Sequence, residues 1–344
     1  MIQLDGSVAE GGGAILRTAL ALSTLTGKAF EISNIRSNRP KPGLKAQHVQ
    51  SLMLLDKLTK CGFTGCEEGS TKLMFIPGEI KAKKVEVDIG TAGSITLLLQ
   101  SALLPCVFSG KGVNITVKGG TDVNWSIPAD YLINVVAPHL RRLADIEVQI
   151  KKRGYYPKGQ GEMNVKIKGQ NTYLWQEINL TKKEKILSIR GISHASTDLL
   201  DRQVADKQAD RAEYLLTGYG VPVTISRTYN KTESLGSGIT LWAIITSGEP
   251  EMSYPVILGS SCLGTKNKKS EDVGREAALD LRKEIDSLAI VDKHLADQLI
   301  PYLGITKGKI ITSKITNHTL ANIYVTEKFL NVRFEIEGNT ITAK

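Results

Sequence analysis

The chain has 344 residues, 41% of them hydrophobic, and a formal net charge of +9. Its length allows a large core in two domains, and no apolar run approaches the roughly 18 residues of a membrane span. The N-terminus reads as a strand rather than a signal peptide. The positive charge favours a polyanionic partner held by phosphate contacts, because an aromatic content of 6% leaves little for a base-stacking platform.

The four cysteines, at positions 61, 66, 106 and 262, form no C-x-x-C pair. Neither a zinc site nor a disulfide framework is therefore indicated, and we expect a protein of a reducing cytoplasm.

A glycine loop lies between a predicted strand at 2–5 and a predicted helix that starts near residue 15. Its three consecutive glycines, at 11–13, favour close backbone approach or positive φ. Glu10 and Arg17 flank them, and an acid and an arginine at a helix start suit phosphate and metal. The alternative is a plain tight turn, since no Walker phosphate-binding motif occurs in the chain.

The first segment is repeated. Residues 5–27 and 88–110 share the same spacing of strand end, glycine-containing turn, apolar helix and Gly-Lys ending. Each copy continues into a strand, a polar loop and a second helix, predicted at 44–58 in the first copy and 131–143 in the second.

A more divergent third copy follows near the C-terminus, with a helix at 295–303, a strand at 310–315, a loop at 316–318 and a helix at 320–329. This copy places His318 where the others carry Arg36 to Arg39 and the turn containing Asp122. The pseudo-symmetry predicts that these three loops converge on one site.

Residues 186–271 break the repeat and are predicted to form a small α/β domain inserted into the third copy. The predicted fold class is therefore α+β, built from α/β repeats. It has a large domain of three sheet-plus-two-helix units at 1–180 and 277–344, and a small inserted domain at 181–276. The basic segment at 264–270 is best interpreted as a solvated turn.

A basic loop precedes the helix at 44–58 and carries Arg36, Arg39, Lys41 and Lys45. Cations at a helix start oppose the helix dipole, so this pattern indicates an anion site, the alternative being a solvated basic loop.

The histidines have different contexts. His294 and Asp297 lie one helical turn apart, where they could bind a metal or cap the helix. His318 could be an exposed nucleophile or an inert loop residue. His48, His139 and His194 are interpreted as structural or surface residues.

Together these segments resemble the RNA 3′-terminal phosphate cyclase family. The resemblance covers nearly the whole chain in order, through DGSVAEGGGAILR, IRSNRPKPGLKAQH, GTAGS, GGTD, RGYYPKGQGE, HLADQL and NHTLANI. It implies the same fold of three repeats and an insertion. The family's loop has a third glycine where this chain has Gln160.

The resemblance implies an enzyme that uses ATP to turn an RNA 3′-phosphate into a 2′,3′-cyclic phosphate through a histidine-AMP intermediate. The nucleophile falls on His318 rather than His294. The competing hypotheses are a cyclase-like ribosome-assembly protein without catalysis and a module that only binds RNA ends. The implied partners are an RNA 3′ end and ATP, with no membrane, and the oligomeric state stays open.

The family's site residues map onto positions of this chain. The implied metal ligand for Mg or Mn is Glu10, and the motif arginines are Arg17, Arg36 and Arg39. Arg36, Arg39, Lys41 and Gln47 are predicted to bind the RNA substrate. Asp297 is predicted to orient the histidine or share the metal. The implied nucleotide-site residues are Gln100, Gln298 and Asp297, together with an adenine sandwich formed by His294 and by Ile127 or the adjacent Pro128.

Overall fold

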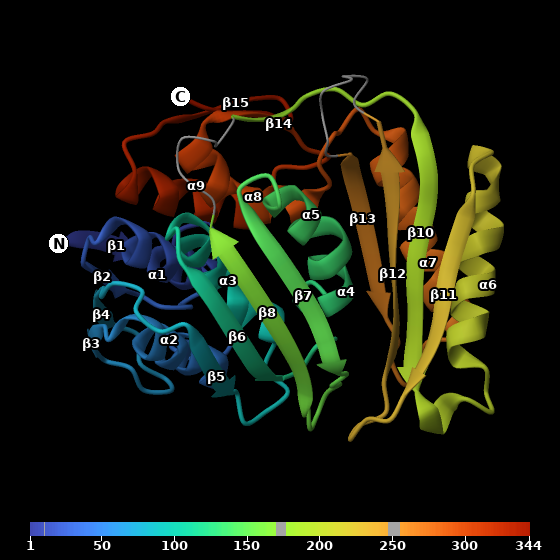
Figure 1. Ribbon diagram of the computed structural model, residues 1–344, viewed down its shortest axis with the longest axis horizontal. Helices are drawn as coiled ribbons and strands as arrows, with labels where there is room; N and C mark the ends of the chain where they lie inside the picture. The colour runs from blue at the N-terminus through green and yellow to red at the C-terminus, as the bar shows by residue number, and fades with distance from the viewer. Residues whose placement is uncertain (10, 170–176, 247–254) are drawn as a thin grey trace.

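The computed structural model describes residues 1–9, 11–169, 177–246 and 255–344 (Figure 1). The described strands form four-stranded sheets, of which three share one topology. This agrees with the predicted fold class of three α/β repeats with an inserted α/β unit.

The first repeat contains β1 (Ile2–Asp5), β2 (Phe30–Ser33), β3 (Gly62–Thr64) and β4 (Leu73–Ile76), with helices α1 (Ala14–Thr26) and α2 (Ala46–Thr59). The spatial order is β1-β2-β4-β3, and β1 runs parallel to β2. A parallel pair needs a crossover, which α1 supplies. Helix α1 ends at Gly27, whose φ of 71° is the left-handed conformation that glycine adopts without strain.

The second repeat has the same order, β5-β6-β8-β7, with β5 parallel to β6. Its strands are β5 (Lys84–Asp88), β6 (Gly112–Gly119), β7 (Ala144–Lys152) and β8 (Gly161–Gly169), and its first helix is α3 (Ile95–Phe108). The second helix is continuous through α4 (Ala129–Tyr131), a π-helical turn η1 (Leu132–Val136) and α5 (Ala137–Leu140).

The third repeat is split along the chain. Strand β9 (Ile178–Leu180) pairs in parallel with β14 (Gly308–Ile311), and β15 (Phe334–Glu337) and β16 (Thr340–Ala343) complete the order β9-β14-β16-β15. Its helices are α8 (Lys293–Thr306) and α9 (Asn317–Phe329). Helix α9 therefore contains His318 in its first turn, whereas the sequence predicted a loop there.

The inserted unit lies between β9 and α8. Its strands are β10 (Ile186–Ser196), β11 (Val223–Asn230), β12 (Ser237–Ile245) and β13 (Val256–Leu263), in the order β11-β10-β12-β13. Helices α6 (Val204–Leu216) and α7 (Ser270–Asp286) pack together and against this sheet, with short 3-10 turns η3 (Thr197–Leu199) and η4 (Thr217–Tyr219) beside α6. Figure 1 shows this sheet on the right and the three repeats on the left.

Two elements of the inserted unit differ from the prediction. Strand β13 and helix α7 had no predicted counterparts. The domain boundary predicted at residue 276 falls inside α7. Because α7 packs on β12, β13 and α6, a boundary there would divide one packed helix.

The core of the repeats is helical. Helix α1 packs against α3 and α9, and α8 packs against α9. Helix α3 is hydrophobic on nearly all sides, with Leu98, Leu99 and Ala102 fully buried, as a helix enclosed by others requires. Among the described residues no helix is long and apolar enough to cross a bilayer. This packing brings the ends of α1, α3, α8 and α9 to one region.

Candidate active site

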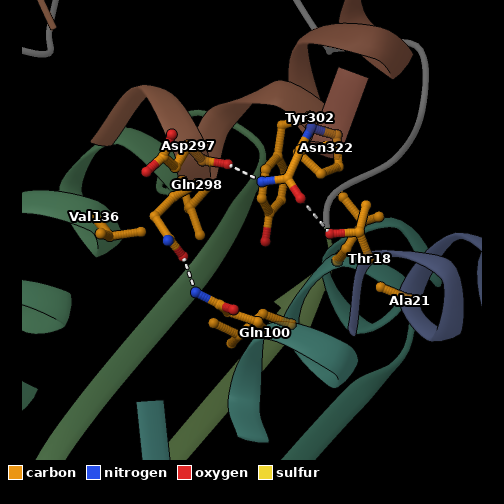
Figure 2. A pocket seen from close by; sticks show the side chains of 12 residues that line it. Thr18, Ala21, Gln100, Val136, Asp297, Gln298, Tyr302 and Asn322 are labelled. Carbon is orange, nitrogen blue, oxygen red and sulfur yellow. Dashed lines mark hydrogen bonds between the residues drawn. The ribbon is translucent and has the colours of Figure 1, made fainter. Parts of the chain in front are cut away.

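A chain of polar side chains connects the three repeats at this region. Arg17 of α1 donates from Nε to Oε1 of Gln100 on α3 at 2.7 Å. Gln100 Nε2 in turn donates to Oε1 of Gln298 on α8 at 2.8 Å, as Figure 2 shows. Burial, with a smaller effect from Arg36, lowers the pKa of Arg17 to about 10, so its guanidinium stays charged at neutral pH.

Asp297 of α8 fixes the start of α9. The hydroxyls of Thr316 and Thr319 each donate to Asp297 Oδ1 at 2.6 Å. Thr316 is also the N-cap of α9, and its hydroxyl accepts from the backbone N–H of Thr319. Asn322 donates to the Asp297 carbonyl and accepts from Thr18 of α1 (Figure 2). The carboxylate is therefore buried but hydrogen-bonded, and burial raises its pKa.

His318 occupies the first turn of α9, between these capping threonines. Burial is the main cause that lowers the pKa of His318; Asp297 opposes the shift, and Arg17 and Arg39 add to it. The imidazole is therefore favoured in its neutral form, which is the nucleophilic one. The charges acting on it come from α1, the basic loop and α8.

The basic loop is tied to the glycine loop. Arg36 has a left-handed φ of 56°, and its Nη1 donates to the carbonyls of Lys41 and Gly43 at 2.8 and 3.0 Å. Asn38 donates to the carbonyl of Ser7 at 3.1 Å. The guanidinium of Arg36 thus holds its own loop in shape, while Arg39 and Lys41 are exposed at its surface.

Gln47, at the start of α2, connects the first two repeats. Its Oε1 accepts from the backbone N–H of Ser94 at 3.3 Å. Ser94 is the N-cap of α3 and accepts from the N–H of Leu97. The amide of Gln47 therefore lies beside the turn of the second repeat that corresponds to the glycine loop of the first.

The residues of the predicted adenine sandwich have other contacts. The carbonyl of Ile127 accepts from Thr96, and Pro128 is the buried N-cap of α4. The exposed ring of His294 meets Tyr131 edge-on, with centroids 6.3 Å apart and an interplanar angle of 90°. Sequence reasoning missed Tyr131, whose signal was its position four residues after Ile127.

Tyr131 is itself fixed by Asp292. Its hydroxyl donates to Asp292 Oδ1 at 2.5 Å, and the same oxygen accepts from the N–H groups of His294 and Leu295 at the start of α8. Helix α4 and the N-terminus of α8 are therefore held together, and the position of His294 depends on this contact.

A small, partly open pocket of about 40 Å³ lies among these residues. Thr18, Gln100, Asp297, Gln298 and Asn322 form its polar wall (Figure 2). This volume has room for on the order of two or three waters, far less than the roughly 300 Å³ that a ligand site needs. A ligand of nucleotide size would not fit inside it.

Glu10, the predicted metal ligand, lies outside the described residues. Among the residues that the structure does describe, one carboxylate–histidine group has ligand atoms close enough for a metal, namely Asp122, Asp130 and His194. Arg153 donates to both carboxylates, at 3.1 and 2.7 Å. A guanidinium in that position makes the group a buried ion-pair network rather than a metal site.

This network connects the second repeat to the inserted unit. His194 of β10 places Nε2 3.4 Å from Asp122 Oδ1, and its Nδ1 lies 2.7 Å from the hydroxyl of Tyr155. The sequence places Asp122 in the turn equivalent to the loop of His318 and predicts that His194 is a structural or surface residue. The structure shows Asp122 paired with Arg153, and His194 fully buried.

Comparison with known proteins gives one consistent result. A family model described as RNA 3′-terminal phosphate cyclase matches residues 8–336. The chain is 44% identical to the protein of that name from Pyrococcus furiosus, over 98% of this chain and 96% of the relative. It is 42% identical to the one from Archaeoglobus fulgidus, over the full length of both. A relative from Methanosarcina acetivorans is 44% identical, over 98% and 97%.

Proposed function

Because this chain belongs to the RNA 3′-terminal phosphate cyclase family, we propose that it converts an RNA 3′-terminal phosphate into a 2′,3′-cyclic phosphate at the expense of ATP. The observation that carries the proposal is the setting of His318. His318 lies in the first turn of α9, and burial lowers the pKa of its imidazole. The charges of Asp297, Arg17 and Arg39 also act on that imidazole.

The first step forms a bond between the His318 imidazole and the α-phosphorus of ATP and breaks the bond to the β-phosphate oxygen. Pyrophosphate leaves and AMP stays on the histidine. Arg17 would neutralise the phosphate charge, because phosphoryl-type transfer depends on in-line positioning and charge neutralisation. Asp297, through Thr316 and Thr319, would keep the first turn of α9 and therefore the imidazole in place.

In the second step an oxygen of the RNA 3′-phosphate attacks the same phosphorus and releases His318. In the third, the neighbouring 2′-hydroxyl attacks the activated terminal phosphorus and AMP leaves. Arg39 and Lys41, on the exposed side of the basic loop, would hold the terminal phosphate. Arg36 would act mainly by shaping that loop, and Gln47 by supporting the loop against the second repeat.

The nucleotide would bind where α3, α4 and α8 meet. Gln100 would hold the side chain of Arg17 in position, and Gln298 would in turn hold Gln100. His294 would lie against adenine, with Tyr131 supporting its edge, and Ile127 or Pro128 would form the opposite face. Arginine contacts and one stacked ring are sufficient to orient a nucleotide on an open surface.

A divalent ion, Mg or Mn, belongs to the proposal as a ligand of Glu10, where it would shield the charge of the triphosphate. The described residues around the glycine loop include Arg17, Arg36 and Arg39, which repel cations. An acid is therefore needed there for any ion to bind. The roles given above to the described side chains do not depend on that ion.

Labelling with ATP that carries ³²P on the α-phosphate tests the proposal. After denaturing electrophoresis the wild-type protein should retain label and His318→Ala should not. Added to the native labelled protein before electrophoresis, an RNA with a 3′-phosphate should remove the label from the protein. The 3′ end of that RNA should become resistant to phosphatase. A non-catalytic cyclase-like protein or an RNA-end binding module would retain no label, and label on His318→Ala would contradict the assignment.

A further inference from the structure

His48 has a fixed and unusual hydrogen-bonding state. It is the third residue of α2, only 2% exposed, and its Nδ1 accepts from the backbone N–H of Lys45 at 3.0 Å. A neutral imidazole that accepts at Nδ1 carries its proton on Nε2. Burial first, and then the charges of Arg17, Arg36 and Lys45, lowers the pKa of His48 to about 3, so the ring stays neutral at any working pH.

The Nε2–H group of His48 is a buried donor without a hydrogen-bond partner in the described part of the chain. It points at Gly13, the N-cap of α1. A Cβ placed on Gly13 would lie 2.5 Å from His48 Nε2 and 2.7 Å from Arg17 Nη1. Two N–H donors therefore converge on the space that this glycine leaves open. Gly13 provides no side-chain cap, so the first amides of α1 face the same region.

We propose that His48 is a phosphate-binding residue whose Nε2–H donates to an oxygen of the phosphate chain held at the start of α1 beside Arg17. The inference rests on the proposed function, because it deepens the description of the same site. A buried polar group without a partner is costly, and a ligand oxygen would relieve that cost on binding. Since Nε2 is buried in the free protein, the glycines of the loop would have to shift to admit the anion.

The tautomer is tested first, in the free protein. The chain has five histidines, so ¹⁵N-histidine labelling gives a countable set of ring signals. The signal that disappears in His48→Asn should be a neutral Nε2–H ring from pH 5 to 8. His139 is the internal reference, because its Nδ1 donates to the Val135 carbonyl at 2.8 Å and it should show the opposite tautomer. A His48 ring protonated at Nδ1 overturns the proposal.

Binding is tested next, by calorimetry with ATP and with inorganic tripolyphosphate. His48→Asn keeps an acceptor near Nδ1 but has no donor at the Nε2 position, whereas His48→Gln places an amide N–H there. We expect His48→Asn to weaken both ligands by about tenfold or more, as for a hydrogen bond to a charged group, and His48→Gln to restore most of the loss. His139→Asn is the matched control and should bind as wild type.

Other outcomes separate the two proposals. Equal binding by His48→Asn and wild type, or equal losses in the asparagine and glutamine variants, overturns the role of His48 and leaves the proposed function standing. A loss with ATP but not with tripolyphosphate also overturns it, because the contact would then be to the nucleoside. A wild-type protein that binds neither ligand refutes the proposed function, and this inference with it.

Discussion

Asp297 accepts a 2.6 Å hydrogen bond from Thr316, the residue that caps the helix carrying His318. The carboxylate of α8 thus determines where α9 begins. The hydroxyl of Thr319 donates to the same oxygen, so Asp297 Oδ1 accepts two hydrogen bonds from the first turn of α9 and its cap. The position of the proposed nucleophile is therefore set by a neighbouring helix as well as by its own.

Asp297→Asn should separate stability from activity. Burial raises the pKa of Asp297 above its ordinary 3.8, so the unfolded carboxyl ionises first and folding stability falls as the pH rises past that value. Asparagine keeps an oxygen acceptor without the charge. We expect the melting temperature of Asp297→Asn at pH 7 to equal or exceed that of wild type, and any difference to shrink toward pH 4. Labelling of the histidine should slow about tenfold, which corresponds to roughly 1.4 kcal/mol of activation free energy. A variant that melts much earlier at pH 7 would contradict this account.

The labelling rate should report the protonation of His318. Because burial, Arg17 and Arg39 lower its pKa and outweigh Asp297, the neutral form persists to below the ordinary 6.5. The rate should be constant above pH 7 and fall in acid, with a midpoint under 6.5. Arg39→Gln should move the midpoint upward by removing one cation, whereas the exposed Arg333→Gln should not. An unchanged midpoint in Arg39→Gln would show that Arg39 does not act on the imidazole.

Gln100→Ala should destabilise the protein. It removes the acceptor of Arg17 Nε and the donor to Gln298, and leaves a buried charged donor unpaired. The expected loss is about 1–3 kcal/mol in the free energy of unfolding by urea. Gln298→Ala should cost less, since Arg17 keeps its contact, and the exposed Gln3→Ala should cost almost nothing. Equal costs for all three variants would show that the connection between repeats does not contribute to stability.

Arg153→Met should weaken the attachment of the inserted unit. Removing one partner from a buried ion-pair network costs about 3–5 kcal/mol. Burial alone would raise the pKa of Asp122, but attraction to His194 and Arg153 outweighs it and holds that pKa well below 3.8. The stability that Asp122 contributes is thus present above pH 4 and lost in stronger acid. The melting temperature should fall more steeply between pH 7 and pH 3 for the wild type than for Arg153→Met.

The repeat architecture was predictable because strand, turn and helix spacing depends on local sequence. The matching intervals at 5–27 and 88–110 correspond to units with identical strand order. Strand β13 was missed because the Gly-Ser-Ser stretch at 259–261 has low strand propensity, and the strand is stabilised by its pairing with β12. The first turn of α9 was missed because Thr316 and Thr319 form a capping pair without the usual Glu or Gln.

The sequence names candidate site residues one by one, whereas their contacts come from the structure. Sequence resemblance named Arg17, Gln100 and Gln298 separately, and the structure links them into one polar chain through three helices. His48 carried no local signal, since its significance comes from Gly13 of another element. Contacts between repeats depend on packing, which spacing along one chain does not encode.

The split third repeat also constrains the order in which the molecule assembles. Strand β9 emerges early, yet its partner β14 is separated from it by the whole inserted unit. During synthesis each of the first two repeats can fold from a continuous segment. The third sheet can form only after β14 has been synthesised, and its pairing with β9 carries the entropic cost of closing a long loop. Helix α9 follows β14, so His318 is positioned after the first two repeats and the inserted unit. A chain interrupted between the basic loop and α9 would contain the proposed phosphate-binding residues without the proposed nucleophile, and we expect it to retain no label from ATP.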